Sequence, residues 1–174
     1  MKRIETLSDL LLFLAASVTI AALYAVFIYA PVEQKMGIVQ KIFYFHVPSA
    51  WVSFLAFFVV FLASILYLWK KKEFYDNLAF SSAEIGLVFC TLVLITGPIW
   101  AKPVWGTWWT WDPRLTTTLV LWLIYIAYLM LRAYGGSGGS RYAAVLGIIG
   151  FLDVPIVHLS IRWWRTMHPK QVSL

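Results

Sequence analysis

The sequence has 174 residues, of which 61% are hydrophobic and 13% charged, and its formal net charge is +6 at pH 7. A soluble domain is closer to half apolar, with about a quarter of its residues charged. The composition therefore excludes an ordinary soluble globular protein and indicates an integral membrane protein, with membrane lipid as a partner and no nucleic acid.

Five apolar segments are long enough to cross a bilayer as helices, which takes about 20 residues. In chain order they cover residues 10–30, 51–69, 85–101, 115–131 and 142–161. Lipid offers no hydrogen-bond partner to an exposed backbone, so we expect an all-α fold, a polytopic helix bundle forming one transmembrane domain over residues 1–174. The first segment lacks a convincing cleavage site, and we expect it to stay in the membrane.

Several polar residues at the ends of these segments predict local structure. Ser81 and Glu84 have the S-x-x-E spacing of a capping box for the third segment. Asp112 precedes Pro113 and is predicted to cap the fourth segment. Asp153 lies inside the fifth segment, where an acid is a functional candidate, although "DVP" can also simply kink the helix.

Five crossings place the loops alternately on two sides of the membrane. Each side carries seven Lys and Arg residues, and the acidic residues leave a net charge of +2 on the N-terminal side and +5 on the other. The rule that basic residues gather in the cytoplasm therefore gives a tie, and only the run Lys70, Lys71 and Lys72 favours a cytoplasmic N-terminus. The excess positive charge on the second side suggests an anionic partner there.

Tryptophan is concentrated on this +5 side, in particular in "WGTWWTWDPRLTT" (residues 105–117). Eight of the ten tryptophans are expected there: Trp51, Trp100, Trp105, Trp108, Trp109, Trp111, Trp163 and Trp164. An interfacial aromatic belt is the simplest alternative. The i, i+3, i+4 spacing of Trp105, Trp108 and Trp109 predicts a short helix lying at the interface.

All three histidines, His46, His158 and His168, fall on the same side. Imidazole is a good iron ligand, tryptophans offer a flat apolar platform, and arginines pair with carboxylates. Haem has an iron, a large flat ring and two carboxylates, so it fits all three features. Two alternatives remain: an intramembrane bis-histidine cytochrome b-type electron-transfer subunit, and a permease subunit without haem.

Four stretches then show a resemblance to a known family: "YFHVPSAW", "ITGPIWAKPVWG", "WGTWWTWDPRLTT" and "PIVHLSIRWWRTMHP". Together, from Val32 to His168, they resemble the haem exporter protein C family (CcmC), the WWD-domain haem-handling membrane proteins of cytochrome c maturation. Family members usually have six spans, whereas five are predicted here.

The resemblance implies a non-enzymatic role in haem transport at the bacterial inner membrane. Haem b would be held non-covalently at the periplasmic face by the WWD loop (residues 102–114) and by His46 and His168. It would then pass to the periplasmic haem chaperone CcmE. The implied partners are the ATP-binding subunit CcmA, the membrane subunit CcmB and the small helical protein CcmD. The N-terminus would be cytoplasmic.

The residues themselves suggest how the roles divide within this site. A ligand that is handed on should be held by side chains able to move away, and His46 is expected just outside a helix that begins near Pro48. His168 precedes a proline, which disfavours helix. We therefore predict His46 and His168 as the axial ligands of haem iron and His158 as a supporting residue. Arg114 is expected to pair with haem propionates, with Arg162 or Arg165 as further candidates. The site is expected to be completed by Trp105, Trp108, Trp109, Trp111 and Asp112.

Overall fold

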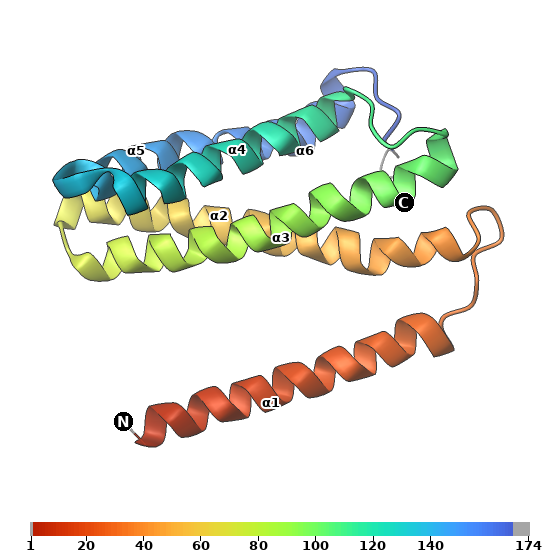
Figure 1. Cartoon of the computed structure of the whole chain (residues 1–174), viewed down its shortest axis with the longest axis horizontal. Coiled ribbons are helices and arrows are strands. Elements are labelled where there is room, and N and C mark those ends of the chain that lie inside the picture. The colour runs from red at the N-terminus through yellow and green to blue at the C-terminus, as the bar shows by residue number, and fades with distance from the viewer. Residues whose placement is uncertain (1, 169–174) are drawn as a thin grey trace. The chain divides into compact units, whose positions relative to one another are not determined.

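The structure, a computed structural model, describes residues 2–168. These residues are helical throughout their length except for short connections and one isolated β-bridge between Glu33 and Gly37. The helices are α1 (Lys2–Tyr24), α2 (Phe43–Lys70), α3 (Glu73–Trp105), α4 (Pro113–Tyr134), α5 (Gly139–Phe151) and α6 (Asp153–Trp163) (Figure 1). The predicted all-α fold is confirmed.

Five helical segments of the described chain are long and apolar enough to cross a membrane, as predicted. They are Thr6–Tyr29, Ile38–Lys70, Glu73–Trp105, Pro113–Tyr134 and Gly136–Trp163. The last segment combines α5 and α6, which are separated only at Leu152. The break immediately precedes Asp153 and Pro155, where a proline is expected to interrupt a helix.

The chain divides into two compact units, one ending at Tyr44 and the other beginning at Phe45. In the first unit, α1 runs into a π-helical turn, Ala25–Tyr29, and a 3-10 turn, Ile38–Ile42, leads into α2. Within this unit Lys41 Nζ donates a hydrogen bond to the Phe27 carbonyl at 3.2 Å. The single transmembrane domain expected from the sequence stays a prediction.

The second unit is built around α4, which packs against α3, α5 and α6. At its centre the ring of Phe57 from α2 stacks on Tyr125 of α4, with 3.6 Å between centroids. Gly86 of α3 makes this close approach possible, because a Cβ there would lie 2.5 Å from the Phe57 ring. Small residues allow membrane helices to pack closely in this way.

A polar network holds the second unit together at the end away from the tryptophan-rich residues 105–112. Arg132 of α4 pairs with Asp76 of α3 and also donates to Ser140 of α5. Ser140 Oγ in turn donates to Asp76 at 3.0 Å, and the Arg132 guanidinium lies over the Phe80 ring. Three helices are thus joined around one largely buried ion pair.

Two local predictions are wrong. Ser81 and Glu84 do not form a capping box, because α3 begins at Glu73 and both residues lie inside it. His46 does not precede its helix, because α2 begins at Phe43 and places His46 in its first turn. Pro48 is accommodated within α2 and does not start it.

Candidate functional site

The tryptophan loop begins where α3 ends at Trp105. The next residue, Gly106, has φ +79°, a left-handed conformation that favours glycine and stops a helix, and its N–H donates to the Lys102 carbonyl at 3.0 Å. Residues 106–112 are not helical. The predicted interfacial helix through Trp105, Trp108 and Trp109 is therefore wrong, because only Trp105 is helical.

Asp112 closes the loop and starts α4, as predicted. Its Oδ1 accepts from the Arg114 backbone N–H at 3.0 Å, and Pro113 occupies the first helical position. The side chain is buried, and its second oxygen, Oδ2, accepts from the backbone N–H of Met167 at 2.8 Å. One carboxylate thus caps α4 and holds the segment that follows α6.

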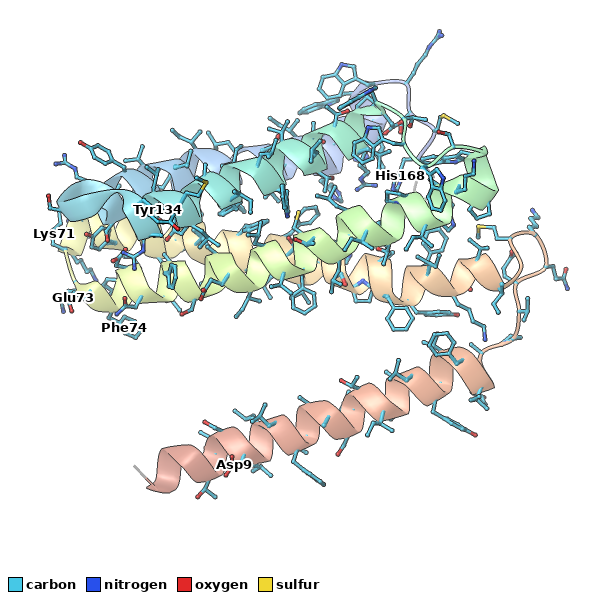
Figure 2. All side chains as sticks on the ribbon, viewed as in Figure 1. Asp9, Lys71, Glu73, Phe74, Tyr134 and His168 are labelled. Atoms are coloured by element: carbon cyan, nitrogen blue, oxygen red, sulfur yellow. The ribbon has the colours of Figure 1, made fainter. Side chains whose placement is uncertain are left out.

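This second contact places His168 beside the tryptophan loop. The His168 ring lies edge-on to Trp105, with 6.5 Å between centroids, and its backbone N–H donates to Thr166 Oγ1 at 3.0 Å. Arg114 Nη1 lies 3.4 Å from His168 Nδ1. Arginine has no acceptor atom, so Nδ1 accepts, and in the neutral ring the proton is then on Nε2. Figure 2 shows His168 at the opposite end of its unit from Lys71 and Tyr134.

His46 is held in the other tautomer by Thr96 of α3. The Thr96 hydroxyl donates its single proton to the Leu92 carbonyl at 2.6 Å, so its oxygen accepts the 2.9 Å contact with His46 Nδ1. The His46 proton therefore lies on Nδ1, and Nε2 has a free lone pair. In metal sites, a hydrogen bond to the other ring nitrogen of this kind orients a histidine ligand.

His46 and His168 lie near each other at one end of the second unit. His46 is half-buried, and both His168 and Arg114 lie close enough to interact with its charge. These three side chains come from the start of α2, from the start of α4 and from the segment after α6. The fold thus assembles, at one end of the second unit, residues that are far apart in the sequence.

The four predicted loop tryptophans have different environments. Trp105 packs edge-on against the buried Trp100, with 5.1 Å between centroids. Trp109 and Trp111 form a second edge-on pair at 5.8 Å. Trp111 is 75% exposed and Trp108 57% exposed, so these two offer the largest accessible aromatic surface of the loop.

His158 lies within α6, as predicted, and its ring is 6.3 Å from that of Trp51 in α2. It therefore contacts the beginning of α2, one turn and a half beyond His46. The contact is compatible with the supporting role predicted for His158, which would be to orient this tryptophan.

Sequence reasoning did not single out Thr96 or the Met167 backbone. Thr96 lies in "ITGPIWAKPVWG", but its side chain could be recognised as the partner of His46 only from the packing of α2 on α3. The Met167 contact is made by a backbone N–H, which the identity of the side chain does not reveal. Both contacts depend on tertiary structure.

Similarity to known proteins shows the family of the chain. The chain matches the family described as "Heme exporter protein C" (CcmC) over residues 1–173. It belongs to the haem exporter protein C family. This is a family of cytochrome c biogenesis.

Relatives of this haem exporter family occur in bacteria and plants. The chain is 40% identical over 144 residues to "Heme exporter protein C" of Escherichia coli K12, covering 80% of this chain and 58% of the relative. It is 40% identical over 141 residues to that of Bradyrhizobium diazoefficiens, covering 80% and 54%. A "cytochrome c biosynthesis ccmC-like mitochondrial protein" of Marchantia polymorpha is 35% identical over 156 residues, covering 89% and 67%. The chain thus spans between about half and two thirds of the length of these relatives.

Proposed function

We propose that the chain binds haem at the end of the second unit where His46, Arg114 and His168 lie. It would then deliver the haem to the periplasmic chaperone CcmE. The observation that carries the proposal is the convergence of two histidines, one arginine and exposed tryptophans at this end. Imidazoles suit the iron, the guanidinium suits a propionate and the indole rings suit the porphyrin face. The site residues therefore match each chemical part of haem.

The two histidines would act in sequence, because their hydrogen bonds prepare them differently. Iron takes an unprotonated ring nitrogen. His46 already presents one at Nε2, since Thr96 holds its proton on Nδ1. In His168 the unprotonated nitrogen is Nδ1, and it accepts from Arg114.

Arg114 links the second ligand to propionate binding. It binds a carboxylate more strongly than a neutral imidazole, because both partners are then charged. When Arg114 turns to a propionate, it releases His168 Nδ1. The ring proton can then move from Nε2 to Nδ1, so that Nε2 is able to bind iron. His46 would thus be the first ligand and His168 the second and more easily released one.

The location of His168 outside the helices supports the proposed topology. Haem that is handed to a soluble chaperone must be accessible from water, and His168 lies outside the helices. We place this end at the periplasmic face of the bacterial inner membrane and the N-terminus in the cytoplasm. CcmA, CcmB and CcmD would be the partners in the membrane complex.

The proposal is tested by measuring the transfer of haem to the chaperone. Haem-loaded protein in detergent is mixed with the soluble domain of CcmE, and the two are separated and their absorption spectra recorded. We expect haem to move to the chaperone. Haem that stays bound through repeated extraction would indicate a cytochrome b-type subunit, and a protein that takes up no haem would indicate a permease subunit.

A further inference from the structure

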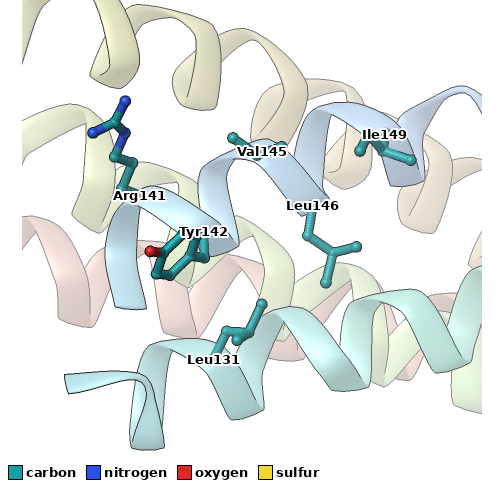
Figure 3. A pocket seen from close by; sticks show the side chains of 6 residues that line it. All are labelled: Leu131, Arg141, Tyr142, Val145, Leu146 and Ile149. Atoms are coloured by element: carbon teal, nitrogen blue, oxygen red, sulfur yellow. The ribbon is translucent and has the colours of Figure 1, made fainter. Parts of the chain in front are cut away.

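A groove on α5 lies at the end of the second unit opposite the candidate haem site. It has a volume of about 650 Å³ and is lined by Leu131 of α4 and by Arg141, Tyr142, Val145, Leu146 and Ile149 of α5. Figure 3 shows Arg141, Val145 and Ile149 along one side of α5, with Tyr142 and Leu146 on the side towards Leu131. Arg141 therefore gives one end of the groove a positive charge, and the rest of its lining is largely apolar.

Arg141 is the feature that distinguishes this groove from ordinary lipid-facing surface. The neighbouring Arg132 is neutralised by Asp76. Arg141 is exposed and has no hydrogen-bond or ion-pair partner among the side chains of residues 6–168. A guanidinium at the start of a membrane helix is suited to a phosphate, which accepts two of its parallel N–H donors.

The apolar part of the groove is suited to an acyl chain. Arg141, Val145 and Ile149 are spaced by four residues and share one helical face. From Arg141 to Ile149 the helix rises about 12 Å, close to the roughly 15 Å hydrocarbon thickness of one leaflet. A lipid with its phosphate at Arg141 would therefore lie against apolar side chains for most of its chain.

The same face is poorly suited to another transmembrane helix. Helix interfaces in membranes are enriched in small residues that allow close approach. The glycines and alanines of α5, namely Gly139, Ala143, Ala144, Gly147 and Gly150, are all buried inside the bundle. Its exposed face has the bulky Val145 and Ile149, which keep a neighbouring backbone at a distance.

We propose that this groove binds an anionic phospholipid, with the phosphate on Arg141 and an acyl chain along Val145 and Ile149. Basic pockets between membrane helices are known binding places for acidic headgroups. The proposal is independent of haem binding, because the groove shares no residue with the haem site.

Lipid retention tests the proposal. The full chain in mild detergent is exposed to equal amounts of phosphatidylglycerol and phosphatidylcholine with identical acyl chains, and the retained lipid is measured by native mass spectrometry. We expect wild type to prefer phosphatidylglycerol about fivefold, the ratio that one basic residue near a membrane surface provides. Arg141→Gln should abolish the preference, and Arg141→Lys should keep most of it.

The matched control is Lys72→Gln, which removes one exposed positive charge at the same end but outside the groove. It should keep the preference, whereas Val145→Trp, which fills the groove, should lose both lipids. Equal retention of the two lipids by wild type would overturn the proposal, as would an equal loss in Lys72→Gln and Arg141→Gln. A photo-crosslinker at Ile149 should label lipid in intact membranes, and labelling of a protein subunit instead would also overturn it.

Discussion

The carboxylate of Asp112 joins two segments that are 55 residues apart, because Oδ2 accepts from the Met167 backbone N–H at 2.8 Å while Oδ1 caps α4. The aspartate of the tryptophan motif is therefore a structural link between the loop and the segment that carries His168. In the proposed haem site, its role would be to position His168.

Replacing Asp112 with Asn should separate these two tasks. The amide keeps one accepting oxygen, so either the α4 cap or the Met167 contact is lost, and a charge-assisted hydrogen bond is typically worth about 1.5–3 kcal/mol. We expect Asp112→Asn to weaken haem binding and to add nothing to the loss caused by His168→Ala. Additive losses in haem titrations of the double variant would show that Asp112 acts independently of His168.

Thr96 should matter through the tautomer of His46. Thr96→Val keeps the shape of the side chain but removes the acceptor of the His46 Nδ1 proton. Loss of the hydrogen-bond partner of a histidine ligand lowers metal affinity about 10- to 100-fold. Thr96→Ser retains the hydroxyl and serves as the control. The measurement is haem affinity from absorption titrations, and equal affinities for the Val and Ser variants would contradict the assigned tautomer.

The exposed loop tryptophans should be needed for haem retention and transfer. We expect the Trp108→Ala, Trp111→Ala double variant to insert normally into membranes but to lose most bound haem, because it loses the accessible aromatic surface of the loop. Trp69→Ala is the control, since Trp69 is 77% exposed, close to the 75% of Trp111, and lies at the end of α2 away from the site. Equal haem content in all three proteins would support a simple interfacial belt.

Arg114 should give haem binding its dependence on salt. Arg114→Gln removes the charge that pairs with a propionate, and we expect about tenfold weaker binding at low salt and a smaller response to added salt, which screens partly exposed charges. Arg165→Gln, an exposed charge beyond α6, should have less effect. A salt response that is the same in wild type and Arg114→Gln would remove the propionate assignment.

Features fixed by short stretches of sequence were predictable. The five apolar segments and the Asp112 cap depend on hydrophobic length and on neighbouring residues, and the structure confirms both. The tryptophan helix was predicted wrongly because the i, i+4 spacing outweighed the glycine that stops α3. The predicted capping box of Ser81 and Glu84 is wrong because α3 begins at Glu73, well before the apolar segment at residues 85–101.

The arrangement of the site depends on contacts that spacing does not reveal. The Thr96–His46 contact spans 50 residues and the Arg114–His168 contact spans 54. The sequence indicated which residue types gather at one side of the membrane. Only the packing of the helices shows that His46 Nδ1 contacts Thr96 and that His168 Nδ1 contacts Arg114.

The most direct measurement of the central claim, that His46 and His168 ligate haem iron, is the absorption spectrum of each His→Ala variant with and without imidazole. We predict that His46→Ala and His168→Ala lose the low-spin haem spectrum and regain it with imidazole, whereas His158→Ala keeps it throughout. If His158→Ala alone loses the spectrum and is rescued by imidazole, the assignment of the ligands is wrong.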